Sequence, residues 1–106
     1  MAQTYSRQTI EALSLLGKLI RVARIERRMT AHELAERTGI SRPSLHRIER
    51  GDPGTAIGSV FEAATIVGVT LFETDPSRLA SDLTRVEEKL TLLPKMIRSR
   101  KIDDDF

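Results

Sequence analysis

The sequence predicts an all-α fold, and three observations lead to this prediction. Apolar residues recur at helical spacing in successive segments, and residues that start or stop helices separate those segments. No run of alternating β-branched residues is long enough to form a sheet. We divide the chain into an N-terminal extension and helix start (1–13), a core domain (14–72), a C-terminal helix (75–93) and a flexible tail (94–106).

The first helix is expected from about Thr9 to Arg28. Its apolar residues recur at steps of three and four, which places them on one stripe that should face the core. The stripe comprises Leu13, Leu16, Leu19, Ile20 and Ala23. Most of the arginines of this segment fall off the stripe, and we expect them on the outer surface.

Two short helices joined by a tight turn should follow. Thr30 and Glu33 have the spacing of a capping box, in which each side chain bonds the backbone N–H of the other residue, and Gly39 ends this helix. Ser41 caps the next helix, and Gly51 closes it. Helices this short have no core of their own, so they must pack on each other and on the helices that flank them.

The helix over residues 41–50 is expected to have two unlike faces. Leu45 and Ile48 point inward, whereas the opposite face is cationic and polar. That face and its flanks hold Arg42, Pro43, Ser44, His46, Arg47 and Arg50. Arginine can bond a guanine edge with two hydrogen bonds, serine can donate or accept, and proline can touch a thymine methyl group. The face therefore suits an element placed in the major groove of double-stranded DNA.

A fourth helix is expected from Thr55, as its cap, to about Val67, with Ile57, Val60, Phe61 and Ala64 inward. A C-terminal helix should begin with Asp75 as cap and Pro76 in its first turn, and should end at Pro94. Its apolar residues recur at steps of four, three, four and three, as in a heptad pattern. They are Leu79, Leu83, Val86, Leu90 and Leu93. This stripe must be buried by packing on its own domain, by dimerisation, or by both.

Four of these residues match a helix-turn-helix unit that starts at Ala31: Ala35, Gly39, Leu45 and Ile48. Together with residues 33–42 and 45–51, they make the chain resemble the XRE family of repressors, which is related to phage lambda repressor and Cro. The resemblance covers roughly residues 14–72. It implies a five-helix lambda-repressor-like DNA-binding domain, followed here by a C-terminal helix and a tail. It also implies a homodimer that represses transcription at a palindromic operator.

The resemblance and the outward face of residues 41–50 together assign contacts with DNA. Base edges are assigned to Arg42, Pro43, Ser44, His46 and Arg47. Backbone phosphates are assigned to Thr30, His32, Ser41, Arg50 and Thr55. For the two histidines, a solvated surface role is the alternative, and Glu49 is expected to pair with Arg24 rather than to act in binding. The chain departs from many relatives at Ala31, where they carry a glutamine that contacts phosphate and braces a partner glutamine.

The charge distribution is consistent with this interpretation. Residues 1–50 carry ten Lys and Arg against five Asp and Glu, whereas residues 51–106 carry seven against ten. A basic first half is typical of a segment that meets a polyanion, although ordinary scatter of surface charge is the alternative.

Several classes of protein are not expected. The chain has no cysteine, and no carboxylate cluster accompanies its two histidines, so we expect neither a disulfide nor a metal site. No nucleophile–base pair or phosphate-binding glycine loop is present, so we expect no enzyme and no cofactor. The absence of a signal peptide and of a membrane-spanning run predicts a cytoplasmic protein without a membrane partner.

The tail supports a second functional hypothesis. It finishes in three aspartates, Asp103 to Asp105, and then Phe106. In size and tail, the chain is similar to the HipB-type antitoxins, which repress their own operon and bind a HipA-type kinase toxin. A disordered tail with an apolar end can fold into a groove of such a partner, and a merely solubilising tail is the alternative.

Overall fold

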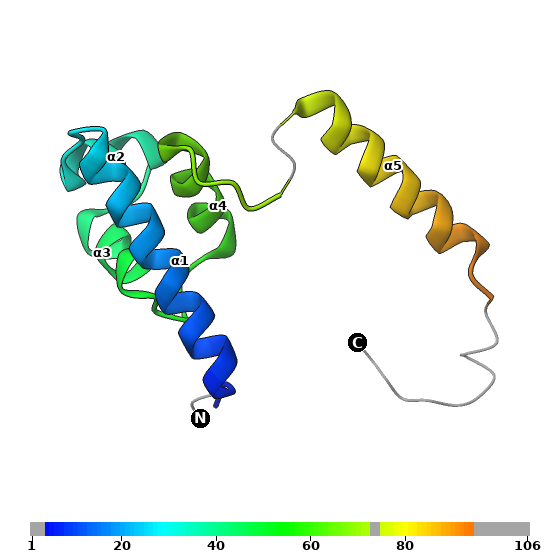
Figure 1. Ribbon diagram of the computed structural model, residues 1–106, viewed down its shortest axis with the longest axis horizontal. Coiled ribbons are helices and arrows are strands. Elements are labelled where there is room, and N and C mark those ends of the chain that lie inside the picture. The colour runs from blue at the N-terminus through cyan, green and yellow to red at the C-terminus, as the bar shows by residue number, and fades with distance from the viewer. Residues whose placement is uncertain (1–3, 73–74, 95–106) are drawn as a thin grey trace. The chain divides into compact units, whose positions relative to one another are not determined.

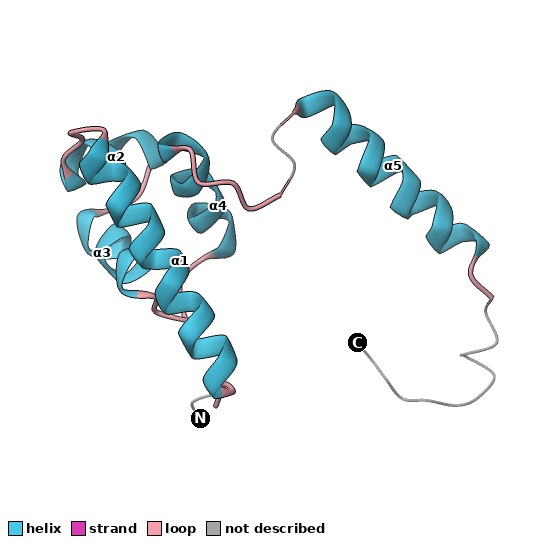
Figure 2. Ribbon diagram, in the orientation of Figure 1, coloured by secondary structure: helices cyan, strands magenta, loops and turns pink. Residues whose placement is uncertain are grey.

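The computed structural model describes residues 4–72 and 75–94. Within them the chain forms five α-helices and no strand, which confirms the all-α prediction (Figures 1 and 2). The helices are α1 (Arg7–Glu26), α2 (Ala31–Thr38), α3 (Arg42–Arg50), α4 (Ile57–Val67) and α5 (Pro76–Leu92). The chain divides into two compact units, Met1–Leu71 with α1 to α4 and Phe72–Phe106 with α5. None of the described helices combines the length and the apolar character that crossing a membrane requires.

One small apolar core holds the first unit together. Helix α1 packs against α3 and α4, and α2 packs against the same two helices. All four helices contribute to the buried cluster, which consists of Ile20, Leu34, Ala35, Leu45, Ile48, Ala63, Ala64 and Val67. Burying one large aliphatic side chain stabilises a fold by roughly 1.5–3 kcal/mol. This shared core therefore fixes the position of α2 and α3, which are too short to persist alone.

The ends of α2 and α3 are set by the capping residues that the sequence predicted. The Glu33 N–H donates to the Thr30 hydroxyl oxygen at 3.0 Å, and the Thr30 N–H donates to the Glu33 carboxylate at 2.8 Å. At the start of α3, the Ser44 N–H donates to the Ser41 hydroxyl oxygen at 3.2 Å. Gly39 ends α2 with a left-handed φ of 80°, which costs glycine little. The tight turn is thus fixed from both sides.

Helix α1 crosses α3 at very short range beside Gly17. A Cβ atom at this position would lie 2.5 Å from the Ile48 carbonyl oxygen and 2.6 Å from that of Glu49. Only glycine permits this approach without a shift of the backbone. The contact brings the middle of α1 alongside the C-terminal half of α3.

Two details of α1 differ from the prediction. The helix ends at Glu26 rather than Arg28, because Arg28 adopts a left-handed φ of 56° and the Met29 N–H bonds back to the Arg24 carbonyl oxygen. Leu19, which was expected to face the core, is 46% exposed. Since α3 packs on the side of α1 that holds Gly17, Leu19 is turned outward.

Helix α4 also starts differently from the prediction. Its N-cap is Ala56, without a side-chain hydrogen bond, and the Thr55 hydroxyl donates instead to the Asp52 carbonyl oxygen at 3.1 Å. Ile57 is the first residue of the helix and is 73% exposed rather than inward. Ala63, which the prediction did not place inside, is fully buried.

Helix α5 has the predicted cap and first residue. The Asp75 carboxylate accepts the Ser77 N–H at 3.2 Å, and Pro76 begins the helix. The helix ends at Leu92, and Leu93, the last residue of the predicted stripe, is its extended C-cap. No residue of α5 is buried, and the five stripe residues are between 47% and 64% exposed. The predicted tail falls outside the described residues except for Pro94. The antitoxin hypothesis that depends on this tail therefore stays a prediction of the sequence.

Candidate nucleic-acid interface

Helix α3 has the two faces that the sequence predicted. Leu45 and Ile48 are 1% and 4% exposed and anchor the helix to the core. On the opposite side, the residues assigned to base edges are exposed, apart from the half-buried Ser44. Arg50 is exposed as well. A helix held by its inner face presents its outer face in a defined orientation, which binding in a groove of DNA requires.

Hydrogen bonds connect three side chains along this outer face. The Ser41 hydroxyl donates to the Ser44 oxygen at 2.9 Å, and the Arg47 Nη2 group donates to the same oxygen at 3.3 Å. Arg47 is therefore steered toward the N-terminal turn of α3. Because the Ser41 hydroxyl already donates to the Ser44 oxygen, it must give up that bond before it can donate to a phosphate, whereas it can keep accepting the Ser44 N–H.

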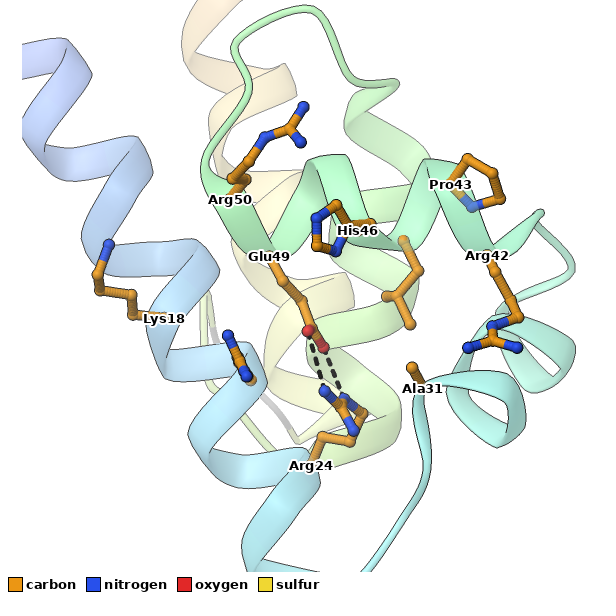
Figure 3. Close-up of a pocket in the computed structure, with 10 residues that line it drawn as sticks. Lys18, Arg24, Ala31, Arg42, Pro43, His46, Glu49 and Arg50 are labelled. Carbon is orange, nitrogen blue, oxygen red and sulfur yellow. Dashed lines mark hydrogen bonds and ion pairs between the residues drawn. The ribbon is translucent and has the colours of Figure 1, made fainter.

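Behind the outer face, Glu49 forms the predicted ion pair with Arg24 (Figure 3). The Arg24 Nε and Nη2 groups donate to the two carboxylate oxygens at 2.7 and 3.1 Å, and Nη1 donates to the Met29 carbonyl oxygen at 3.0 Å. The Arg24 and Glu49 side chains are only 11% and 8% exposed. This pair joins α1 to α3 and to the turn before α2. Because it is neutralised, Glu49 does not set a bare negative charge beside the cationic face.

A shallow groove of about 580 Å³ runs between α1 and α3 (Figure 3). Its lining includes Lys18 and Arg21 from α1 and Arg42, His46 and Arg50 from α3. Glu49, paired with Arg24, supplies the one carboxylate among the described residues that line it. The groove is thus a cationic surface built by two helices.

The sequence analysis assigned no role to Lys18 or Arg21. Both follow Gly17, and the close approach at that glycine places them beside α3. The signal in the sequence was a glycine within an otherwise regular helical pattern, which often marks close packing. Lys18 is already oriented, since its Nζ group donates to the Ser14 hydroxyl oxygen at 2.8 Å.

The residues assigned to phosphates have partners within the protein. His32 Nε2 lies 4.0 Å from a Glu36 carboxylate oxygen, and Arg50 Nη2 lies 4.0 Å from a carboxylate oxygen of Asp52. The Thr55 hydroxyl bonds the Asp52 backbone, as described above. Both contacts are long at 4.0 Å, and the one between His32 and Glu36 is an ion pair only when the histidine is protonated. Pairs this long contribute little to stability. A phosphate could therefore replace either carboxylate at small cost.

The start of α2 is both rigid and polar. The hydrogen bond from the Thr30 backbone N–H holds the pKa of the Glu33 carboxyl below its ordinary value of 4.5, and the Thr30 hydroxyl and the charge of Arg37 act in the same direction. Ala31, at the position of the glutamine in many relatives, is half-buried against the core and borders the groove. In Figure 3, the Arg42 side chain extends toward Ala31.

Comparison with known proteins gives one match. The profile of the helix-turn-helix domain family, an XRE-like family, matches residues 15–75. This segment is more than half of the chain and contains α2, α3, α4 and most of α1. No curated protein and no solved structure matches the chain significantly.

Proposed function

Because the chain belongs to this XRE-like family of helix-turn-helix domains, we propose that it is a sequence-specific transcriptional repressor that binds a palindromic operator as a homodimer. The observation that supports this most is the geometry of α3. Its inner residues Leu45 and Ile48 are buried in the core, and its outer face is exposed, cationic and continued by cations of α1.

The outer face of α3 reads base edges in this proposal. Arg47 lies on the exposed face and can form two hydrogen bonds with a guanine. Arg42 is the first residue of the helix, and Pro43, Ser44 and His46 follow within its first two turns. Together with Arg47, these side chains would enter the major groove of the DNA. Ser44 shares its hydroxyl with Arg47, and both would exchange that bond for contacts with bases.

Backbone phosphates are held by residues around this face. Lys18 and Arg21 contact one strand from α1, and Arg50 acts from the end of α3. Thr30, His32, Ser41 and Thr55 complete the set. Arg42 extends toward Ala31 and can take the phosphate contact that a glutamine makes in many relatives. Phosphate contacts of this kind fix the position of a protein on DNA without reading its sequence.

A homodimer is needed because one such unit reads too few base pairs to select a site in a genome. A two-fold dimer reads two half-sites about 34–36 Å apart on one side of the duplex. The proposed dimer surface is the apolar stripe of α5 and its C-cap, and none of these side chains is buried among the described residues: Leu79, Leu83, Val86, Leu90 and Leu93.

Selection from a pool of random DNA duplexes tests this function. The full chain should enrich one inverted repeat whose half-sites lie about one helical turn apart. Arg47→Ala should weaken binding to that repeat. Arg85→Ala, which removes the same charge from α5 together with its exposed ion pair to Asp82, should not. Recovery of unrelated sequences after repeated rounds would contradict the proposal.

A further inference from the structure

The apolar stripe of α5 is not buried within its own helix, so the first unit or a second copy must cover it. Its five residues are about half exposed, and α5 contains no buried residue. A helix of 17 residues is marginally stable by itself in water. Covering the stripe with an equivalent stripe would remove eight large side chains from water, four from each of two helices, because Leu93 is the C-cap and lies outside the helix. The remaining question is how two copies of α5 would align.

Charged residues beside an apolar stripe decide how two helices align. On a helical wheel, Asp82 and Lys89 border one side of the α5 stripe, seven residues apart. Ala80 and Glu87 border the other side. The two sides therefore carry different charge patterns, and each orientation of the pair brings different charges together.

In a parallel, in-register pair, the side of one helix that carries Asp82 and Lys89 faces the side of the other that carries Ala80 and Glu87. Asp82 then lies beside Glu87 of the partner subunit, and the two-fold axis repeats this contact. Both contacts join negative charges. Lys89 would face the partner subunit beyond the end of its α5 at Leu92, so no attraction between the described helices offsets the repulsion.

In an antiparallel pair, each side of one helix faces the same side of the other, so the side with Asp82 and Lys89 faces its own copy. Leu79 then packs on Leu90 of the partner subunit, and Leu83 packs on Val86 of the partner subunit. In this register, Asp82, whose carboxylate also pairs with Arg85 of its own helix at 2.7 Å, lies beside Lys89 of the partner subunit on one side, again twice. On the other side, Glu87 faces Ala80 of the partner subunit, which carries no charge.

The same charges also select the register. Sliding one antiparallel helix by seven residues keeps the apolar stripes in contact. One slide places two copies of Asp82 together, and the opposite slide places two copies of Lys89 together. Both slides exchange attraction for repulsion and bury a shorter stretch of the stripe.

We propose that α5 pairs with α5 of a second copy in an antiparallel two-helix interface, with Asp82 beside Lys89 of the partner subunit at both ends. This deepens the proposed function and rests on the homodimer that it includes. The first residues of the two α5 helices would lie at opposite ends of the pair, roughly 25 Å apart for 17 residues at 1.5 Å each. That separation suits two units that bind half-sites one helical turn apart.

Disulfide formation in the full chain tests the orientation. The natural chain has no cysteine, so introduced thiols report only the chosen contact. Leu79→Cys and Leu90→Cys proteins of different mass are mixed in a glutathione redox buffer. The antiparallel pair predicts the mixed disulfide between the two variants. It predicts few disulfides within either variant, because equivalent positions would lie eleven residues, or roughly 16 Å, apart, whereas a disulfide needs Cα atoms within about 7 Å.

Two other results would overturn this proposal. Dominant disulfides within each variant would show a parallel pair. Failure to cross-link in a protein that still dimerises would place the interface elsewhere, for example on the exposed apolar row Leu15, Leu19 and Val22 of α1, and a purely monomeric chain would exclude the pair altogether.

Charge reversal tests the register and gives opposite signs for the two orientations. Asp82→Lys should raise the dimer dissociation constant about threefold to tenfold in the antiparallel pair, since two exposed attractions become repulsions. Adding Lys89→Asp should restore the original value. In a parallel pair, Asp82→Lys would instead face Glu87 and tighten the dimer, which would contradict the proposal. Glu87→Gln serves as the control and should leave the antiparallel dimer unchanged.

The two proposals can fail separately. If the mixed disulfide forms but duplex selection enriches no site, the DNA-binding function fails and the α5 pair stands. If an inverted repeat is enriched but no mixed disulfide forms, the repressor stands and the α5 pair fails.

Discussion

The arginines of the first unit have two different tasks. Arg24 is nearly buried and paired with Glu49, whereas Arg42, Arg47 and Arg50 are exposed on or beside the outer face of α3. Charge counting alone does not separate these groups. What distinguishes Arg24 is a nearly buried carboxylate partner, Glu49, the one carboxylate among the described residues that line the groove.

Breaking the pair should cost much more than removing an exposed charge. In Glu49→Leu, Arg24 stays charged and nearly buried without its partner, so we expect a loss of about 3–5 kcal/mol of unfolding free energy. The double variant Arg24→Met/Glu49→Leu should recover much of that loss, because no unpaired charge remains. Urea denaturation measures both values. A single variant as stable as the wild type would show that the pair does not hold α1 on α3.

Lys18 and Arg21 should act on DNA affinity without acting on its specificity. Lys18→Gln and Arg21→Gln should each lower the slope of log affinity against log salt by about one unit, as expected for the loss of one phosphate contact. The order of preference among operator variants should stay the same. Salt titrations of a labelled duplex give the slopes, with Arg85→Gln as the control, and unchanged slopes would remove both residues from the interface.

At the scale of single elements, the start of α2 links helix stability to pH. The Glu33 pKa is lowered by its hydrogen bond with the Thr30 backbone, so the ionised carboxylate stabilises the fold. Because the folded value lies below the unfolded one, this stabilisation is complete above the unfolded pKa. It is lost as pH falls through the folded pKa.

The variant Glu33→Gln isolates this effect, because glutamine can still complete a capping box but does not ionise. The wild type should be more stable than Glu33→Gln at pH 7, and the difference should shrink as pH falls through the folded pKa of Glu33, which lies below 4.5. Thermal melts across that range measure the difference. If it stayed constant with pH, the carboxylate charge would have no part in the cap.

The crossing of α1 and α3 depends on the absence of a side chain at Gly17. In Gly17→Ala, the new methyl group would meet two backbone carbonyl oxygens of α3, so we expect a loss of about 1–3 kcal/mol of stability. DNA affinity should fall too, because Lys18 and Arg21 move away from α3. Gly58→Ala is the matched control: its Cβ would meet no atom within 4 Å, so alanine should stabilise α4 by up to about 1 kcal/mol.

The sequence predicted features that depend on neighbouring residues better than features that depend on packing between helices. The caps at Thr30 and Ser41 and the left-handed Gly39 depend on a few neighbouring residues, so the sequence alone indicated the helix-turn-helix and its outer face. The outward turn of Leu19 and of Ile57 depends on which side of each helix its neighbours cover. No pattern within one helix contains that information.

The same limit applies to the candidate interface. Its α3 half could be assigned from one helical wheel. Its α1 half consists of Lys18 and Arg21, which lie more than twenty positions before α3 in the chain. They reach α3 only because the backbones of α1 and α3 come close together at Gly17. The Arg24–Glu49 pair was predicted across a similar distance because a buried carboxylate beside a basic helix needs a cation.

At the scale of the whole molecule, the two units have different surfaces, one cationic and one apolar. The first unit holds the excess of basic residues and presents its cationic groove between α1 and α3. The second unit contributes an apolar stripe with an alternating charge pattern at its borders. Pairing of two second units would bring two first units to one duplex. A palindromic site would then offer each first unit one half-site.

The central claim is that the outer face of α3 reads base sequence, and one measurement tests it most directly. The affinities of the wild type and of Arg47→Ala are determined at one salt concentration, for the selected operator and for duplexes that carry each single base change in a half-site. We predict that Arg47→Ala loses about 1–3 kcal/mol on the operator and becomes indifferent to one base pair of each half-site, while its other preferences persist. Equal affinity and an identical set of preferences for the two proteins would contradict the claim.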